Sequence, residues 1–154
     1  MSRKRRILII LVVATLMFIW TQSAMDPEKS SEESGFVMRI VAPVLELFLG
    51  KGNVTEHFVR KLAHFTEYAI LGAEIILLMF DIRGSGAKTV ALSGNFSLTA
   101  AVVDETIQIF SGRGSSLKDV WLDFAGAMFG IAISFFLKYR IMKSHSGDEP
   151  HPGQ

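Results

Sequence analysis

Cysteine is absent from the 154-residue sequence. Its absence excludes disulfide bridges, zinc sites built from thiolates and catalysis by a cysteine nucleophile, on whichever side of a membrane the loops lie. A basic stripe interleaved with aromatic residues is also missing, because the cations are scattered at the ends of segments and the net charge is only +1. We therefore expect no nucleic-acid partner.

Hydrophobic residues are abundant instead, at 49% of the chain, which is high for a soluble domain of this length. Four segments, at about 7–24, 54–80, 88–110 and 119–140, are apolar over most of the length that a hydrocarbon core of about 30 Å requires. The sequence thus predicts an all-α integral membrane bundle of four transmembrane helices, forming one domain over residues 1–143. A cleaved signal peptide is the alternative for the first segment, although Gln22 and Ala24 form a poor cleavage site.

The connections and the cations predict the arrangement around these spans. Apolar residues recur at helical spacing over about 36–50, which predicts an amphipathic helix in the first outer loop. The polar tail at 144–154 is expected to be disordered. Nine cations near the segment ends lie on the side of the two termini and seven on the other side. The positive-inside rule then predicts a multi-pass protein with both termini cytoplasmic.

Polar and ionisable residues interrupt the predicted spans mainly on one side. In an antiparallel bundle, the first and third spans end at the outer face, where the second and fourth begin. Residues three and four apart share a helix face, so these side chains form stripes. They are Gln22 and Ser23 in the first span, Arg60, Lys61, His64 and Glu67 in the second, Asp104, Glu105 and Gln108 in the third, Arg113 in the loop, and Asp119 and Asp123 in the fourth.

These stripes are expected to face inward, because exposing an ionised group to lipid costs at least about 3 kcal/mol. One interpretation is a polar clasp that only holds the helices together. We favour a water-accessible functional pocket, because the acids exceed what such a clasp requires. The acids and His64 could also bind a divalent cation, but cations nearby compete for them and no metal-ligand spacing motif is present. We therefore expect no metal and no cofactor.

Two other functional classes stay open. His64 next to Glu67 or Asp104 could serve as a general acid or base, which would make the protein a membrane enzyme. Glu74, deeper in the second span, and Asn95 in the third keep a small proton-linked transporter as a further alternative. The latter ranks last because only these two residues suggest a polar path to the cytoplasm.

Gly126 and Gly130, flanked by alanines, form a face of small residues on the fourth span. Small residues allow helix backbones to approach closely in membranes. The pattern favours helix packing as the role of both glycines, and it leaves a homodimer through the same face as an alternative.

Three separated stretches resemble the VanZ-like family, which includes a teicoplanin-resistance protein of bacterial glycopeptide-resistance clusters. They are FIWTQS, RKLAHFTEYAILG and DETIQIFSGRGSSLKDVWLDFAGAMFG, which occur in the family's order between about residues 7 and 137. Asp123 falls where members of the family often have Asn. The matching positions are Gln22, Ser23, Lys61, His64, Glu67, Asp104, Glu105, Gln108, Arg113, Asp119, Asp123, Gly126 and Gly130.

The resemblance implies a small protein of the bacterial cytoplasmic membrane and cell envelope, without a settled biochemical activity. Together with the predicted pocket, it suggests that the protein binds a membrane lipid headgroup, a lipid-linked cell-wall precursor or a lipoglycopeptide. Such binding would lower susceptibility to teicoplanin-type antibiotics. An enzyme that acts on a lipid-linked or phosphate-bearing envelope substrate is the alternative.

Overall fold

Four long helices make up most of the structure, a computed structural model that describes residues 1–25, 35, 38–47, 50, 54–112, 114 and 116–146. They are α1 (Arg3–Ala24), α3 (Glu56–Arg83), α4 (Ala87–Phe110) and α5 (Leu117–Ser146). Residues 38–47 are also helical, within the predicted amphipathic stretch, of which residues 36–37 and 48–49 lie outside the described part. Residues 144–146, predicted to begin a disordered tail, are instead the last residues of α5, and residues 147–154 lie outside the described part. These ranges contain no strand, so the predicted all-α class is confirmed.

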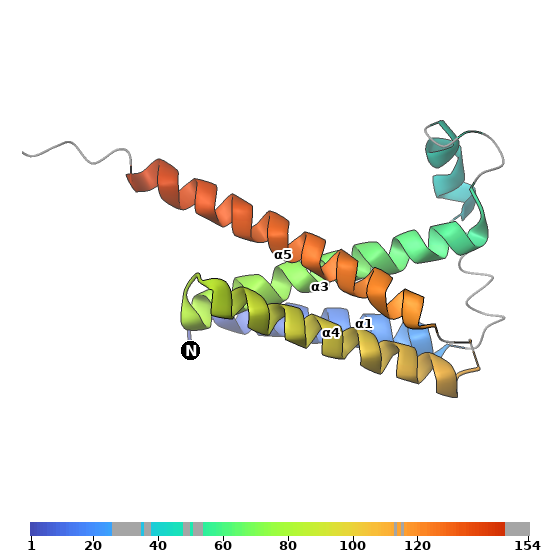
Figure 1. Ribbon diagram of the computed structural model, residues 1–154, viewed down its shortest axis with the longest axis horizontal. Coiled ribbons are helices and arrows are strands. Elements are labelled where there is room, and N and C mark those ends of the chain that lie inside the picture. Colours follow the sequence, from blue (N-terminus) through green and yellow to red (C-terminus); the bar gives the residue numbers. More distant parts are fainter. Residues whose placement is uncertain are drawn as a thin grey trace, which may run out of the picture.

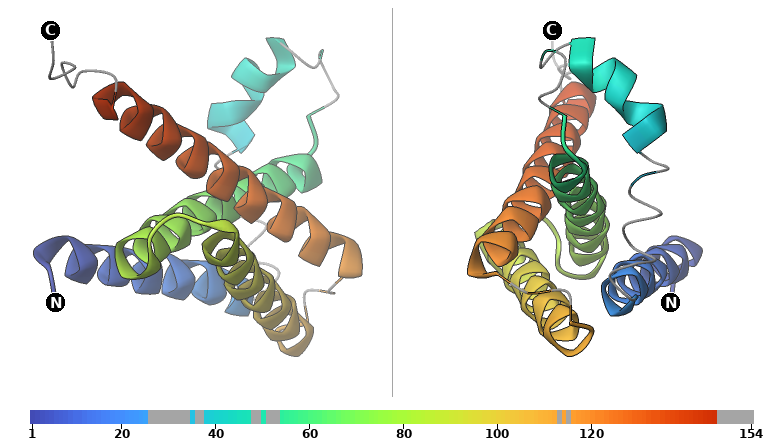
Figure 2. Two further views of the ribbon diagram at one scale, coloured as in Figure 1. Left: turned by 60° about the vertical axis from the view of Figure 1, so that its left-hand side comes forward. Right: turned by 90° about the vertical axis from the view of Figure 1, so that its right-hand side faces the viewer.

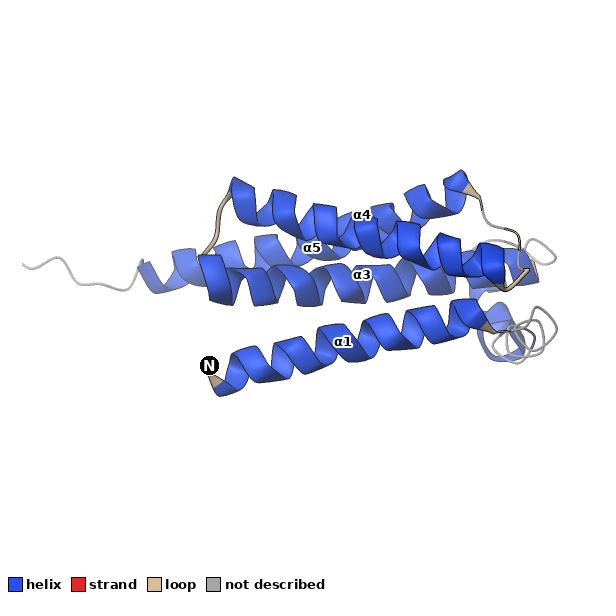
Figure 3. Ribbon diagram, turned by 90° about the horizontal axis from the view of Figure 1, so that it is seen from below, coloured by secondary structure: helices blue, strands red, loops and turns tan. Residues whose placement is uncertain are grey.

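Successive long helices are antiparallel. Figure 1 shows α1 and α4 running in one direction and α3 and α5 in the other. The helix α3 contacts each of the other three, and Figure 3 shows α1 running alongside it. At one end of the bundle α1 and α4 stop and α3 and α5 begin. We call this end, which brings together Ser23, Lys61, Ser111 and Asp119, the polar end.

A small core occupies the middle of the bundle. Ile19 of α1, Tyr68 and Leu71 of α3, and Ala101 of α4 are fully buried and form one cluster. The Tyr68 hydroxyl lies among them and donates a hydrogen bond of 3.2 Å to the Ala100 carbonyl. The phenol therefore links α3 to α4 just below the polar end, and its polar atom is satisfied inside an apolar environment.

Glycines bring α3 and α5 together at the crossing that is visible in Figure 2. A Cβ atom at Gly126 would overlap the backbone carbonyl of Phe65, and one at Gly130 would overlap that of Ala69. Only a residue without a side chain permits this approach. The glycine face of α5 is thus covered by α3 of the same chain, so a homodimer would have to use another face.

Polar residues run through the middle of α4, and the backbone of the helix satisfies their hydroxyl groups. Ser93 Oγ donates to the Thr89 carbonyl and Ser97 Oγ to the Ser93 carbonyl, both at 2.9 Å. Thr99 on the exposed face donates to the Asn95 carbonyl in the same way. A hydroxyl that bonds within its own helix needs no other partner. These residues are therefore compatible with apolar surroundings.

Apolar side chains are exposed on every long helix of the bundle. On α1, Ile10 and Met17 are 65% and 64% exposed, and Phe96 of α4 and Phe129 of α5 exceed 50%. Soluble monomers rarely expose continuous apolar surfaces of this extent. Two helical segments, Arg3–Ala24 and Leu117–Arg140, are long and apolar enough to cross a membrane. Hydropathy of the described helices thus supports two of the four predicted spans.

Candidate functional site

The first turns of α3 present basic side chains at the polar end. The helix begins after Thr55, whose hydroxyl accepts a backbone N–H at 3.2 Å. His57, Arg60, Lys61 and His64 follow at intervals of three and four residues, so they share one helix face. These four residues form a basic wall, from which Lys61 contacts α5 and His64 contacts α4 and α5.

The two cations of this wall have different ion-pair partners. Lys61 Nζ lies 2.8 Å from Oδ1 of Asp119, which links the beginnings of α3 and α5. Arg60 Nη2 lies 2.8 Å from Oε1 of Glu56 in its own helix. Arg60 Nε is buried and has no hydrogen-bond partner within the described part of the chain. The arginine therefore retains a donor for an anionic ligand.

His64 lies between two buried carboxylates that come from different helices. Its Nδ1 atom is 3.8 Å from Oδ2 of Asp104 on α4 and 3.8 Å from Oδ1 of Asp123 on α5. Asp104 is 0% and Asp123 1% exposed. Ligand atoms of the three residues all lie within 4.8 Å of one another. Three helices thus contribute one group each to a compact set that could hold a metal ion.

Asp123 is buried without hydrogen bonds. Neither of its carboxylate oxygens has a hydrogen-bond partner among the described residues, and both atoms are inaccessible to solvent. The described ion-pair partner is His64, at 3.8 Å, which is beyond hydrogen-bonding distance. Burying a carboxylate in this way is costly unless a proton or a cation compensates its charge. The buried Asp123 carboxylate therefore requires a proton or a cation to compensate its charge.

Glu105 and Gln108 of α4 hold the turn into α5. Glu105 Oε2 accepts the N–H of Ser116 at 2.9 Å, directly before α5 begins, where the helix dipole favours a negative charge. Gln108 Nε2 donates to Glu105 Oε1 at 3.2 Å and to Asp104 Oδ2 at 3.1 Å. Gln108 therefore orients two carboxylates within α4, and Glu105 connects α4 with the beginning of α5.

The last turn of α1 reaches the same end of the bundle. Ser111 Oγ, after α4, donates to the Ser23 carbonyl at 2.8 Å. The Ser23 side chain is fully buried, and its Oγ has no hydrogen-bond partner among the residues that are described. Gln22 beside it is half-buried. Ser23 thus joins α1 to α4 through its backbone.

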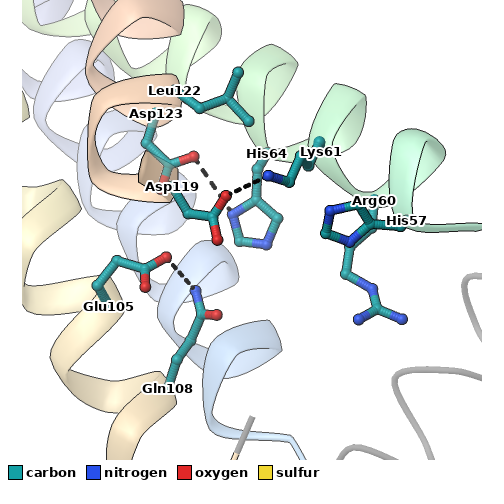
Figure 4. A pocket seen from close by; sticks show the side chains of 9 residues that line it. All are labelled: His57, Arg60, Lys61, His64, Glu105, Gln108, Asp119, Leu122 and Asp123. Carbon is teal, nitrogen blue, oxygen red and sulfur yellow. Dashed lines mark hydrogen bonds and ion pairs between the residues drawn. The ribbon is translucent and has the colours of Figure 1, made fainter. Parts of the chain in front are cut away.

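A cavity of about 50 Å³ opens between α3, α4 and α5 at the polar end (Figure 4). One water needs roughly 10–15 Å³ on this measure, so the cavity has room for a few waters or an ion, but cannot enclose a complete glycopeptide. Its residues are His57, Arg60, Lys61 and His64 from α3, Glu105 and Gln108 from α4, and Asp119, Leu122 and Asp123 from α5.

The sequence-predicted residues have different places relative to this cavity. Asp104 lies behind it, in contact with His64. Gln22, Ser23 and Glu67 do not line it. Arg113 lies outside the described residues. The predicted residues that do line the cavity are Arg60, Lys61, His64, Glu105, Gln108, Asp119 and Asp123.

Sequence reasoning missed two lining residues, His57 and Leu122. His57 precedes Arg60 and Lys61 by three and four residues, so extending the basic stripe one turn backward would have found it. Leu122 carries no such signal, because it is one of many apolar residues in the fourth predicted span. Whether it lines the cavity depends on how α5 is rotated against α3.

The residues that suggested a transporter do not lie on a common path. Thr15 Oγ1 of α1 donates to Glu74 Oε1 of α3 at 3.2 Å, so a neighbouring helix satisfies one oxygen of this acid. Asn95 is on the exposed face of α4. The two side chains therefore do not line a polar route from the cavity to the opposite end.

Comparison with known proteins yields one relationship. The model of a protein family described as VanZ/LLP1 matches residues 8–138. The matched range includes every residue that lines the cavity. No curated protein and no solved structure matches the chain.

Proposed function

The chain belongs to the VanZ/LLP1 family, and from this premise we propose that it is a multi-pass protein of the bacterial cell envelope that binds the charged headgroup of a membrane lipid at its polar end. A lipid-linked cell-wall precursor or a lipoglycopeptide would present its charged portion to the same cavity. Binding of this kind is non-catalytic, and it would lower susceptibility to teicoplanin-type antibiotics.

We propose that all four long helices span the membrane. At about 1.5 Å per residue, the 28 residues of α3 and the 24 residues of α4 exceed the roughly 30 Å of a hydrocarbon core. Both helices carry exposed apolar residues in their middle, such as Ile70 and Phe96. The hydrogen bonds from serine hydroxyls to backbone carbonyls within α4 support the same arrangement, because they satisfy polar groups that the hydrocarbon core cannot.

The polar end faces outward in this proposal. The cluster Arg3–Arg6 begins α1 at the opposite end, where Arg5 pairs with Asp81 near the end of α3. The positive-inside rule assigns such a cluster to the cytoplasm. The beginning of α1 and the last turns of α5 lie at the same end (Figure 1). This supports the proposal that both termini are cytoplasmic and that the cavity opens at the outer leaflet.

The observation that carries the proposal is the buried Arg60 Nε, which has no hydrogen-bond partner in the described chain and belongs to a cavity wall shared with Lys61. Phosphate oxygens accept charge-assisted hydrogen bonds from such donors. Carboxylates such as Asp119 lie on the opposite wall and suit a cationic portion of the same ligand. A headgroup that carries a phosphate therefore fits the charge distribution.

Lipid retention tests the proposal. The wild-type protein, purified in detergent with phosphatidylglycerol and phosphatidylethanolamine, is expected to retain about one phospholipid, detected by native mass spectrometry. The double variant Arg60→Gln/Lys61→Gln should retain it at least about tenfold less, because two phosphate-binding charges are lost. Arg83→Gln is the matched control, since Arg83 is an exposed cation at the far end of the same helix. Equal retention by all three proteins would refute headgroup binding.

Antibiotic susceptibility tests the cellular consequence. Expression of the wild-type chain in a teicoplanin-sensitive bacterium should raise the inhibitory concentration of teicoplanin, but not that of a glycopeptide without a lipid tail. The Arg60→Gln/Lys61→Gln variant should lose this effect at equal membrane abundance. An unchanged inhibitory concentration of teicoplanin with the wild-type chain would refute a role in resistance. Headgroup binding would then be judged by the retention assay alone.

A membrane enzyme is the second candidate, and the placement of His64 supports it. An imidazole between two buried carboxylates, at the edge of a cavity with cations, is suited to proton transfer on a phosphate-bearing substrate. Lipid analysis of cells that express His64→Ala or Asp104→Asn is the test. A lipid that accumulates only with these variants would favour catalysis, whereas unchanged lipid profiles would exclude it for this histidine.

A further inference from the structure

Three ligands of types that bind transition metals converge at the polar end, one from each of α3, α4 and α5. We propose that His64, Asp104 and Asp123 bind one divalent transition-metal ion, with Zn²⁺ and Mn²⁺ as the best-suited cations. This site goes beyond headgroup binding, because it would be occupied without any lipid.

The geometry is close to that of a three-ligand metal site. Ligand atoms at about 2.1 Å from a metal are separated from one another by roughly 3.0–4.2 Å, depending on the coordination angle. His64 Nδ1 lies 3.8 Å from each aspartate, and all three ligand atoms are within 4.8 Å of one another. Small side-chain rotations would therefore bring the set around one ion, without movement of the helices.

The state of Asp123 is the independent observation that points to a ligand. Both of its oxygens are buried and lack a hydrogen-bond partner in the described ranges, and the residue is 1% exposed. The cations that the sequence suggests as competitors pair elsewhere, since Lys61 lies beside Asp119 and Arg60 beside Glu56. A protonated His64 adds only one positive charge to two aspartates, whereas a divalent ion neutralises both and coordinates them directly.

The surroundings also select the kind of ion. An imidazole ligand favours Zn²⁺ or Mn²⁺ over Mg²⁺ and Ca²⁺, which prefer all-oxygen sites. His64 and Asp123 line the cavity, so the open coordination positions would face it. Its volume of about 50 Å³ can hold the waters that complete the coordination shell. A phosphate oxygen of a bound headgroup could replace one of these waters.

Metal titration of the purified full-length chain tests the site. After removal of metal with a chelator, the wild-type protein should bind about one Zn²⁺ or Mn²⁺ per chain by elemental analysis. At about a hundredfold excess over Kd, the midpoint of thermal unfolding should rise by roughly 5–10 °C. Mg²⁺ and Ca²⁺ should give smaller shifts. A wild-type protein that binds neither Zn²⁺ nor Mn²⁺ stoichiometrically would overturn the proposal.

A matched pair of variants locates the ion. Asp123→Asn should weaken Zn²⁺ binding by at least about tenfold. Asp81→Asn, at the other end of the bundle, should bind within about twofold of the wild type, because Asp81 is neither in the ligand set nor in the cavity. Equal losses in both variants would indicate non-specific binding to acidic groups and refute the site.

A wild-type measurement makes the test independent of variant folding. Co²⁺, used as a spectroscopic probe, should give visible absorption bands of a protein-bound ion with imidazole ligation, and Zn²⁺ should displace them. A spectrum identical to that of aqueous Co²⁺ would overturn the site. Because lipid retention is measured separately with the Arg60→Gln/Lys61→Gln variant, failure of the metal site and failure of headgroup binding give different results.

Discussion

Each end of the bundle has a short, partly exposed ion pair, but only the polar end also holds buried carboxylates among the described residues. At the cytoplasmic end of the proposed arrangement, Arg5 Nε lies 2.8 Å from Asp81 Oδ2, and the side chains are 35% and 21% exposed. At the polar end, Asp104 and Asp123 are almost completely buried, with His64 at 3.8 Å from each. A short, hydrated ion pair is sufficient to join two helices. Buried carboxylates at longer distances are poorly suited to that role, which supports the proposed binding site.

The largest expected effect comes from the crossing that connects the two ends. Gly130→Val should reduce the free energy of unfolding by about 3 kcal/mol or more, because its side chain would overlap the Ala69 carbonyl on α3. Reversible unfolding in mixed micelles measures this change. Gly86→Val is the control, since a Cβ there meets no atom within 4 Å. Equal losses in the two variants would contradict close packing of α3 and α5.

Replacing an aspartate with asparagine should change the free energy of unfolding in opposite directions at the two ends. In metal-free protein, Asp123→Asn should raise the free energy of unfolding by about 1–3 kcal/mol, because it removes a buried charge that has no hydrogen bonds. Asp81→Asn should lower it by at most about 1 kcal/mol, because it breaks a partly exposed ion pair. Unfolding titrations of both variants provide the comparison. Destabilisation by Asp123→Asn would mean that the Asp123 charge stabilises the native protein even without metal.

Removing one cation at each end should distinguish an effect on phospholipid binding from an effect on stability. Lys61→Gln and Arg5→Gln each remove a partly exposed ion pair and should each change the free energy of unfolding by no more than about 1 kcal/mol. Only Lys61→Gln should lower phospholipid retention, since Lys61 lines the cavity. Native mass spectrometry of both variants measures this difference. Lower phospholipid retention in Arg5→Gln would indicate lipid binding at the end opposite the cavity and contradict the proposal.

The smallest expected difference concerns two serines of α1. Ser2→Ala should cost about 0.5–1 kcal/mol, because Ser2 Oγ accepts the Arg5 N–H at 3.1 Å and caps the helix. Ser23→Ala at the polar end should be neutral or slightly stabilising, because the buried Oγ has no hydrogen-bond partner in the described residues. Thermal unfolding of the two variants checks the difference. A larger loss for Ser23→Ala would show that its hydroxyl contacts a ligand or a neighbouring group.

Sequence periodicity predicts much of the candidate site but not its pairing. The basic stripe on α3 follows from helical spacing, and antiparallel spans bring Lys61 to the same end as Asp119. Spacing does not decide whether a cation pairs within its own helix or with another helix. The Arg60–Glu56 pair within α3 therefore became visible only in the structure. Spacing also does not separate Glu67, which does not line the cavity, from His64, which does. That distinction depends on the rotation of α3 against its neighbours.

The order of apolar and charged residues along the chain determines the all-α class, the family relationship and the concentration of charge at one end, because helical spacing and burial of apolar surface act locally. Only the tertiary structure decides which charges meet. The close crossing at Gly126 and Gly130 sets how α5 is rotated against α3, and so brings Asp123 to His64 while Lys61 reaches Asp119. Distances between residues on different helices depend on crossing geometry, which arises from packing of the whole bundle.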